Sequence, residues 1–355
     1  MVVSIVSENN MKLNDFYYNL PQKLIAQKPI KPRDHSKLMV INRKKKSIEH
    51  KHFFDILNYL NKGDVLVLNN TKVFPARLIG QRQDTCGKVE MFLLNRISLN
   101  KWQVLIGNRR KRQGQIIQFD NGLECLIEKK IDQSIWLVKF NIQGKRLEKL
   151  IDQIGEVPTP PYIHIPEEKT KSKKLKEEYQ TVYASKKGSV AAPTAGFHFT
   201  KSLINKLKKK GIKFEYITLH VGFGTFEPVK VNDVKKHKMH SELAMIDKKT
   251  AQRLNKAKKE HKRIIAVGST TICTLEAFST KNNVKSGSKW INLFIYPGYR
   301  FKFVDAIITN FHLPCSTLFM LISAFLTRSF ILKAYNIAIK KKYRFFSFGD
   351  AMFID

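Results

Sequence analysis

The chain has 355 residues, of which 43% are apolar and 26% are charged, a balance that excludes global disorder and predicts about two domains. Lys and Arg number 64 against 29 Asp and Glu, and the net charge of +35 indicates an anionic partner, with nucleic acid ahead of a membrane surface. Mutational drift in an AT-rich genome would produce the same excess, so the charge alone does not decide the function.

Neither the cysteines nor the apolar stretches indicate an exported or membrane protein. The four Cys, at positions 86, 125, 273 and 315, form no C-x-x-C pair and are interpreted as free thiols of a reducing compartment. The N-terminus lacks the pattern of a signal peptide, and the longest apolar stretch, 317–326, is too short for a membrane helix. We therefore expect a cytoplasmic protein that makes no membrane contact.

The first part of the chain, residues 11–75, has a mixed α and β pattern after an extension at 1–10 without apolar periodicity. Its predicted elements are a strand at 37–41, a helix at 53–60 that ends before Gly63, and a buried strand at 64–68.

Residues 76–150 are predicted to form an inserted all-β domain. Short apolar runs broken by Gly, Asn and Asp are typical of a small β-barrel or sandwich. The runs are 88–94, 102–106, 116–119, 124–128 and 135–140. Only the last ten residues of this segment have a helical pattern.

The α/β pattern returns at residue 151 and continues to the end of the chain. A helix capped by Thr200 and ended by Gly211 is followed by further elements. They are strands at 214–221, 263–267, 291–296, 304–309 and 345–348, and helices at 248–261, from Thr270, at 316–326 and at 329–342. The predicted fold is an α/β main domain, 11–75 and 151–355, that carries the inserted barrel-like domain.

Polar or small residues follow the predicted strands of the main domain. The six groups are Asn69-Asn-Thr, His220-Val-Gly, Gly268-Ser-Thr-Thr, Tyr296-Pro-Gly, Asn310-Phe-His and Phe348-Gly-Asp. In open α/β sheets the ligand crevice lies beyond the carboxyl ends of the strands. Ordinary turns would use the same residue types. Because three of the six groups contain His or Asp, the sequence favours a polar crevice.

Three common fingerprints are missing. The chain has no G-x-x-x-x-G-K-[ST] and no G-x-S-x-G, which argues against P-loop ATPases and α/β-hydrolases. Gly222-Phe-Gly224 follows a strand, but Glu227 occupies the third glycine position of a dinucleotide fingerprint and no helix is predicted after it.

Two histidine-containing segments are candidate sites. The small residues and prolines of 188–200 let the backbone approach a ligand, and His198 within it has either a structural or a substrate-facing role. His237, His240 and Glu242 have the spacing of metal ligands, but Lys235, Lys236 and Lys238 surround them. Acid–base or phosphate contact therefore fits this second cluster better than a metal.

Together these segments resemble the S-adenosylmethionine:tRNA ribosyltransferase-isomerase family of queuosine synthesis. The matching stretches run in order from Met11: Asp15-Phe-x-x-x-Leu-Pro21, Arg33-Asp34-x-Ser36, 69–78, 155–163, 179–184, 188–200, 218–228, 237–242, 309–317 and 343–352. Two positions depart from the family pattern. Cys273 stands where Arg is expected, and Lys37 stands where Arg is usual, which keeps the charge without the bidentate fork.

The resemblance implies a reaction. The ribosyl part of S-adenosylmethionine is transferred and isomerised onto 7-aminomethyl-7-deazaguanine at the wobble position of tRNA, giving epoxyqueuosine, adenine and methionine. S-adenosylmethionine would be consumed as a cosubstrate, so no cofactor and no metal are expected. We expect a monomer.

This chemistry needs a base for the carbon beside the sulfonium, an acid for the departing adenine and a proton acceptor near the amine. Within the matching stretches we expect His198 and His312 to transfer protons and Asp350 or Glu242 to orient charge. The expected substrate contacts are Asn69, Thr71, Arg77, Thr194, Thr218, His220, Gly222, Gly224, Thr225, His240 and Asn310. A non-catalytic RNA-binding module and a metal-dependent hydrolase that uses His237 and His240 are the alternatives.

Overall fold

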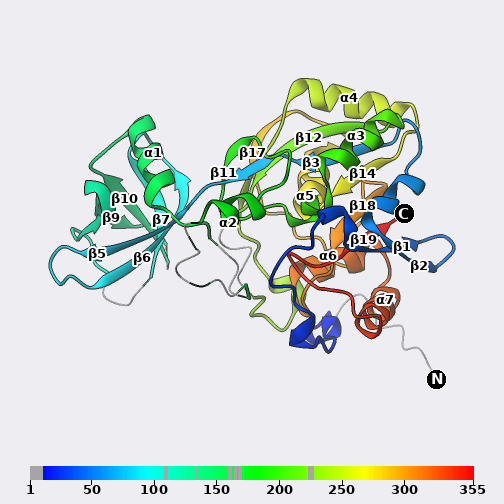
Figure 1. Ribbon diagram of the computed structural model, residues 1–355, viewed down its shortest axis with the longest axis horizontal. Helices are drawn as coiled ribbons and strands as arrows, with labels where there is room; N and C mark the ends of the chain where they lie inside the picture. Colours follow the sequence, from blue (N-terminus) through cyan, green and yellow to red (C-terminus); the bar gives the residue numbers. More distant parts are fainter. Residues whose placement is uncertain are drawn as a thin grey trace. The chain divides into compact units, whose positions relative to one another are not determined.

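The chain forms two compact units, which are described separately (Figure 1). This computed structural model describes residues 11–107, 111–132, 134–158, 162–163, 166, 170, 172–222 and 228–355, so the predicted extension at 1–10 lies outside the described residues. The sheet unit comprises the chain up to Thr71, together with Thr181–Lys186 and Pro193–Asp355. The barrel unit comprises Lys72–Gln180 and Lys187–Ala192, a range that contains the predicted insertion at 76–150.

A nine-stranded mixed sheet forms the centre of the sheet unit, in the order β17-β13-β12-β3-β14-β18-β19-β1-β2. Its strands are β1 (Lys37–Asn42), β2 (Ser47–His52), β3 (Val65–Asn69), β12 (Lys213–His220), β13 (Glu242–Ile246), β14 (Ile264–Val267), β17 (Gly287–Ile291), β18 (Ala306–Asn310) and β19 (Ala351–Ile354). Every position of β3, β14, β18 and β19 is buried, because both faces of the sheet are covered.

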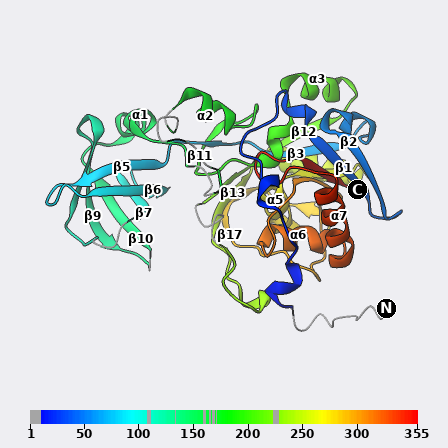
Figure 2. The same cartoon turned by 60° about the horizontal axis from the view of Figure 1, so that its bottom comes forward.

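Helices cover the two faces of this sheet. They are α3 (Lys201–Lys209), α4 (Lys248–Lys259), α5 (Ser269–Phe278), α6 (Thr317–Phe325) and α7 (Arg328–Lys340). In both ribbon views α3 lies on one side of the sheet and α6 and α7 lie on the other (Figures 1 and 2). The α3 face is apolar, with Leu203 and Leu207 packed against strand residues such as Leu66 and Ile308. As predicted, the Thr200 side chain caps α3 by accepting a hydrogen bond from Leu203 N at 3.1 Å.

The barrel unit confirms the predicted small all-β fold as a closed six-stranded barrel in the order β10-β7-β6-β5-β8-β9. Its strands are β5 (Arg77–Arg82), β6 (Lys88–Arg96), β7 (Lys101–Ile106), β8 (Ile116–Phe119), β9 (Glu124–Lys130) and β10 (Ile135–Phe140). Buried and partly buried positions alternate along β7 and β8, as the inward and outward faces of a barrel require. The unit also contains α1 (Gly144–Ile154) and α2 (Lys173–Glu178), and the short strands β4 (Thr71–Val73) and β11 (Lys186–Ser189) lie at its junctions with the sheet unit.

Two strands that the sequence did not predict are explained by their surroundings. In β5 a Cβ at Gly80 would lie 2.5 Å from the carbonyl oxygen of Gln118, so only glycine fits there and the strand has no continuous apolar pattern. Strand β2 pairs only with β1 at the sheet edge, and nearly all its side chains are exposed. An exposed, charged edge strand has no apolar alternation to detect.

Three predicted elements are wrong. The segment 53–60 forms a 3-10 helix at Phe53–Asn58 rather than an α-helix. The strand predicted at 291–296 is β17, which ends at Ile291 because its partner β13 begins opposite, at Glu242. The final strand is β19, not 345–348. Residues 344–350 form a tight turn in which Phe346 has a φ of 72° and Asp350 N donates to Arg344 O.

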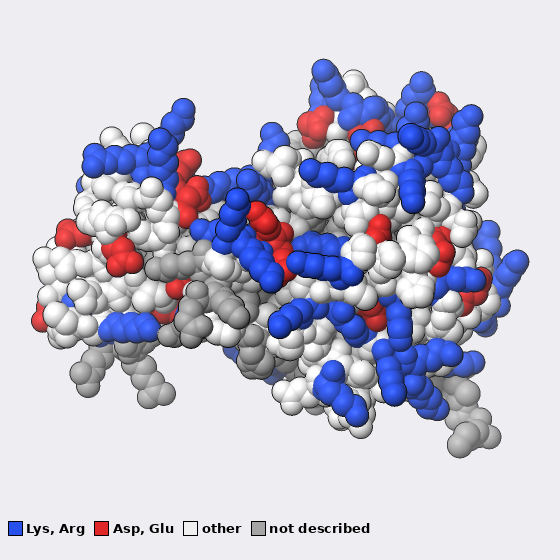
Figure 3. All heavy atoms as spheres, viewed as in Figure 1, with Lys and Arg blue, Asp and Glu red and all other residues white. Residues whose placement is uncertain are grey.

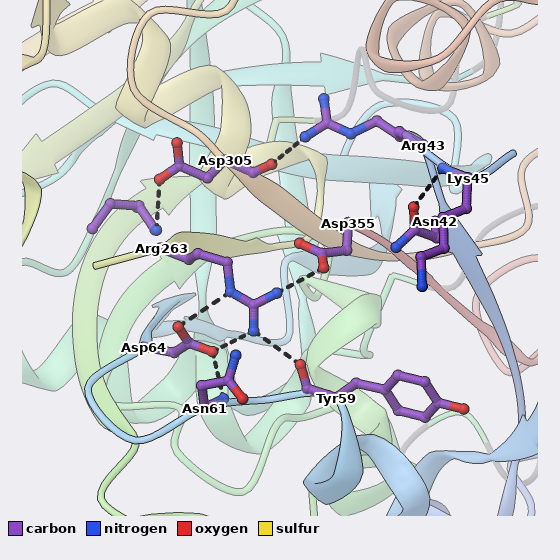
Figure 4. Close-up of polar contacts among 10 residues, drawn as sticks. Asn42, Arg43, Lys45, Tyr59, Asn61, Asp64, Arg263, Asp305 and Asp355 are labelled. Atoms are coloured by element: carbon purple, nitrogen blue, oxygen red, sulfur yellow. Dashed lines mark hydrogen bonds and ion pairs between the residues drawn. The ribbon is translucent and has the colours of Figure 1, made fainter. Parts of the chain in front are cut away.

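Ion pairs join the amino ends of the parallel strands (Figure 4). Arg263, just before β14, donates to Asp64, just before β3, and its other terminal nitrogen lies 2.8 Å from a side-chain oxygen of Asp355. Asp305, just before β18, accepts from Lys258 Nζ at 2.6 Å and from Ile264 N at 2.8 Å. These charged groups bind one another or the backbone, so this edge of the sheet has a structural role.

Replacing Arg263 by alanine is expected to lower the free energy of unfolding by about 3 kcal/mol, because Asp64, whose side chain is 6% exposed, would lose its partner. Urea unfolding of the purified protein measures this. Lys256→Ala is the control, since the Lys256 side chain is 79% exposed and lies 3.9 Å from Glu260. Its effect should stay within about 0.5 kcal/mol. Equal losses in the two variants would contradict the structural role of this edge.

Within the described residues, no single helix has both the length and the apolar composition to cross a membrane, and α6 and α7 reach that threshold only as a pair bent by 115°.

Candidate active site

The topology gathers most of the predicted polar strand ends at one edge of the sheet. Strands β3, β12, β14 and β18 are mutually parallel, so their carboxyl ends meet at this edge. β19 runs antiparallel to β18, and β1 is parallel to β19, so their amino ends lie at the same edge. We call this the polar edge, with Ser36, Asn69, His220, Gly268, Asn310 and Asp350 as its residues.

The predicted gathering of polar strand ends is therefore found, with three corrections. Asp350 reaches the polar edge because it precedes an antiparallel strand, not because it follows a parallel one. Asn69 is the last residue of β3 rather than the first residue after it. Tyr296 does not follow a strand directly, since β17 ends five residues earlier at Ile291.

The small-residue segment forms a tight 3-10 helix, Thr194–His198, that places His198 at the polar edge. Gly196 is required here, because a Cβ would lie 1.9 Å from the hydroxyl of Tyr183. The small residues of this segment therefore let its backbone pack closely against a neighbouring side chain. Thr194, a predicted substrate contact, is the first residue of this helix and is partly exposed.

His198 is buried, and one face of its imidazole borders a small pocket. Its Nδ1 lies 2.8 Å from Ser36 Oγ, and its ring packs 5.0 Å from that of Phe53. The pocket has a volume of about 10 Å³, room for roughly one water molecule, and is also lined by Arg33, Phe197 and Phe348. The Phe197 and Phe348 rings are stacked, so the walls are aromatic and the rim is cationic.

Burial, and then the positive charges of Arg33 and Arg344, lower the pKa of His198 to about 3, so the imidazole is neutral at physiological pH. The Asn310 side chain opposes this lowering of the His198 pKa. Its influence is the smallest of the four. Even so, Nε2 of His198 and Oδ1 of Asn310 are buried and form no hydrogen bond of acceptable geometry with any described residue. Nε2 is therefore the atom of this ring that is available for chemistry.

His312, the other predicted proton-transfer residue, is held on all sides. Its Nε2 lies 2.8 Å from Thr309 Oγ1, its backbone nitrogen donates to the hydroxyl of Tyr335, and its carbonyl accepts from the hydroxyl of Tyr18. Burial lowers the pKa of His312 to about 3. Since both tyrosines belong to a buried aromatic cluster with Phe319, this environment suits a positioning residue.

Asp350 joins two segments at the polar edge. One carboxylate oxygen accepts from the backbone nitrogen of Lys37 at 3.0 Å, and the other accepts from that of Arg344 at 2.8 Å. Burial raises the pKa of Asp350, while these hydrogen bonds and the two cationic side chains oppose the rise. The carboxylate is thus positioned to hold the loop that borders the His198 pocket.

Several predicted substrate contacts form hydrogen bonds with one another. The amide of Asn69 bridges both backbone groups of Leu219 and also contacts Thr71 N and Thr270 Oγ1. Thr71 Oγ1 lies 2.8 Å from His220 Nδ1, and burial lowers the pKa of that histidine. Thr218 donates to Asn70 at 2.7 Å. These residues fix the loop that follows β3.

Glu242, the first residue of β13, accepts a hydrogen bond from Gly222 N at 3.0 Å. It also acts on Cys273, whose pKa is raised to about 12 by burial and by the negative charges of Glu242 and Glu276. The neutral thiol at this position therefore faces two carboxylates, where an arginine would have paired with them.

The two remaining histidines of the second cluster lie near each other. Burial and the neighbouring His240 lower the pKa of His237, and His240 itself is exposed. No group of three or more His, Cys, Asp or Glu side chains within the described parts of the chain is arranged to hold a metal ion.

The structure does not test three of the predicted contacts at the polar edge. Arg77 belongs to the barrel unit, where it binds the carboxylates of Glu90 and Glu156. Gly224 and Thr225 lie outside the described residues. Conversely, Ser36 and Arg33 were not predicted as site residues. The signal was present in Arg33-Asp34-x-Ser36, but nothing in the sequence shows that this segment lies beside His198.

Comparisons with known proteins agree over almost the whole chain. A family described as "Queuosine biosynthesis protein" matches residues 13–354. Proteins named S-adenosylmethionine:tRNA ribosyltransferase-isomerase from Acetivibrio thermocellus and Clostridioides difficile are each 50% identical to the chain, with 97% of this chain and all of each relative covered.

A solved structure gives the same result. The crystal structure of S-adenosylmethionine tRNA ribosyltransferase from Thermotoga maritima is similar, with a TM-score of 0.55 and 36% identity over 96% of this chain and all of that one. The chain therefore belongs to the queuosine biosynthesis family, together with relatives named S-adenosylmethionine:tRNA ribosyltransferase-isomerase.

Proposed function

We propose that the chain transfers and isomerises the ribosyl part of S-adenosylmethionine onto 7-aminomethyl-7-deazaguanine at the tRNA wobble position. The products would be epoxyqueuosine in tRNA, adenine and methionine, and no further cofactor is required. As a member of its family the chain is a transferase-isomerase. We also propose that the protein is cytoplasmic. We propose that it is a monomer, because a single copy supplies every group of the polar edge.

One observation carries the assignment of a site: a neutral imidazole, buried with its Nε2 lacking a hydrogen bond of acceptable geometry, lies beside an aromatic pocket at the polar edge. In the proposed reaction His198 takes the proton from the carbon next to the sulfonium, whose positive charge makes that carbon acidic. Neutral imidazole has a lone pair for this purpose. The Phe348 ring offers an aromatic surface for the cationic sulfonium, while the Phe197 ring already carries the Arg33 guanidinium.

Substrate binding would make His198 a stronger base. Arg33 and Arg344 are among the groups that lower its pKa. An anionic group of the substrates, either a tRNA phosphate or the methionine carboxylate, would neutralise these charges and raise the pKa toward the range that suits general catalysis. In this proposal Asp350 and His312 hold the surrounding loops, and Glu242 provides negative charge near Gly222.

The direct test is mass analysis of tRNA bearing 7-aminomethyl-7-deazaguanine after incubation with the protein. We expect the tRNA to gain a ribosyl-derived group only when S-adenosylmethionine is present, with adenine released in equal amount. The gain of a single methyl group would overturn the proposal, as would tRNA binding without any change in mass. Loss of the activity on addition of a chelator would favour the metal-dependent alternative.

Binding of tRNA is expected to weaken steeply with salt, because Lys and Arg side chains are spread over the face of the molecule in Figure 3. Each phosphate contact contributes roughly 0.7–0.9 to the negative slope of log affinity against log salt. Filter binding at increasing KCl concentrations should therefore give a slope of several units. A flat response would assign the charge excess to composition rather than to RNA binding.

A further inference from the structure

A second pocket lies in the sheet unit, where the chain leaves β17 at the polar edge. Because β17 is antiparallel to β13 and β13 to β12, the carboxyl end of β17 lies at the same edge as that of β12. The pocket has a volume of about 380 Å³ and is open to solvent. Its lining consists of Met11, Lys235, Phe294, Tyr296, Pro297, Gly298 and Tyr299.

Aromatic rings form much of this pocket and are only partly buried. The rings of Phe294 and Tyr296 lie 5.0 Å apart, and Phe294 also meets His237 edge to face at 5.3 Å. Tyr299 forms a second edge-to-face pair with Phe301 at 5.2 Å. Half-exposed rings that are fixed by one another present faces to solvent at little entropic cost.

The segment that carries Tyr299 is fixed by a buried carboxylate. Glu276, on α5, is fully buried and accepts hydrogen bonds from the backbone nitrogens of Lys302, Phe303 and Val304 and from the hydroxyl of Tyr299. The aromatic wall is therefore organised before any ligand binds.

The rim of this pocket is cationic. Lys235 lines it, Lys236 and Lys238 are exposed next to it in sequence, and Arg300 and Lys302 are exposed on either side of Phe301. The Lys302 ammonium lies 6.0 Å from the Tyr299 ring centroid. The carboxylates near these cations bind backbone nitrogens of the fold. Asp233 accepts from Lys235 N, and Glu276 accepts from Lys302 N.

We infer that this aromatic pocket stacks an unpaired base of the tRNA substrate while its lysine rim holds the adjacent phosphates. Aromatic faces combined with a basic rim are the usual means of binding single-stranded nucleic acid. The lysine rim attracts the phosphates of a nucleotide. The inference rests on the proposed function for the identity of the RNA, and it gives the protein a second point of contact besides the modified base.

The test compares Tyr296→Ala with Tyr296→Phe, which keeps the ring, and with Trp290→Ala, which removes an aromatic side chain on β17 that is 53% exposed and does not line the pocket. The probe is a fluorescent RNA hairpin with the sequence of a tRNA anticodon arm. A fully paired RNA duplex of the same length is the matched ligand.

We expect Tyr296→Ala to weaken hairpin binding by about 5- to 100-fold, the scale of one stacked base, and to leave duplex binding unchanged. Tyr296→Phe and Trp290→Ala should bind the hairpin as the unmodified protein does. Lys235→Ala should reduce the salt slope by about one phosphate contact. Affinity for S-adenosylmethionine, measured by calorimetry, should be the same in all variants.

Two results would overturn the inference. Unchanged hairpin binding by Tyr296→Ala would show that no base stacks there. Weaker S-adenosylmethionine binding with normal hairpin binding would assign the pocket to the cosubstrate. Either result is compatible with full ribosyl transfer by the unmodified protein. Failure of that reaction in the unmodified protein would instead overturn the proposed function. The hairpin-binding measurements would then still show whether the pocket binds RNA.

Discussion

Replacement of His198 by alanine is expected to lower turnover by about 100- to 10,000-fold, the usual contribution of a general acid or base. Its Nδ1 is held by Ser36, while Nε2 is buried without a hydrogen bond at the wall of an aromatic pocket. Single-turnover measurements with saturating S-adenosylmethionine and tRNA separate this effect from binding. S-adenosylmethionine affinity should change much less than turnover.

A structural role for His198 predicts a different set of results. His198→Gln retains a polar group of similar reach, so it would restore both stability and turnover if the ring only held its loop. If the ring transfers a proton, His198→Gln should regain stability but not turnover. His261→Asn, which removes an exposed imidazole after α4 at a position of positive φ, is the control and should keep full activity. Full turnover in His198→Ala would remove this residue from the mechanism and leave Glu242 and Asp350 as candidate bases.

The parallel strands could be predicted from sequence because their signal is local. β3, β14 and β18 are largely apolar runs, β12 mixes apolar with polar residues, and polar or small residues stand at or after the end of each. Since parallel strands align their carboxyl ends, the location of the polar edge followed from the strands alone. The wrongly placed last strand did not affect this result, because the antiparallel β19 brings Asp350 to the same edge by its amino end.

The partners of individual side chains could not be predicted, since they depend on contacts between distant parts of the chain. Asn69 looked suited to hold a nucleoside, but its amide oxygen and nitrogen are occupied by Leu219 across 150 residues. Arg77 looked suited to hold an anion, but Glu156, 79 residues away, occupies it. Ser36 and His198 meet across 162 residues, and no local pattern indicates such a pair.

The neutral state of the two buried histidines predicts a strong loss of stability in acid. His198 and His312 have pKa values of about 3 in the folded protein, against about 6.5 in an unfolded chain. Between pH 6.5 and 3 the unfolded chain binds a proton at each histidine that the folded protein does not. The free energy of unfolding therefore falls as the pH falls through this window, by about 1 kcal/mol per pH unit for each histidine.

Urea unfolding at pH 7.5, 6.5, 5.5 and 4.5 measures this slope. Asp350 acts in the opposite sense, because its pKa is raised by burial and the folded protein takes up its proton first. The pKa of Asp247 is lowered, mainly by its hydrogen bonds with Thr250, so this carboxylate adds to the loss at lower pH, and the histidine slope is compared between pH 6.5 and 5.5. His312→Gln should be less stable at pH 7.5 but should have a smaller pH slope, and His198→Gln should lower the slope similarly, while His50, His220 and His237, whose pKa values burial also lowers, account for part of the rest. His35→Gln, at an exposed position, is the control and should keep the whole slope. If His312→Gln kept the slope of the unmodified protein, the histidine would be charged in the folded state, and its hydrogen bond to Thr309 would have to be that of an imidazolium donor.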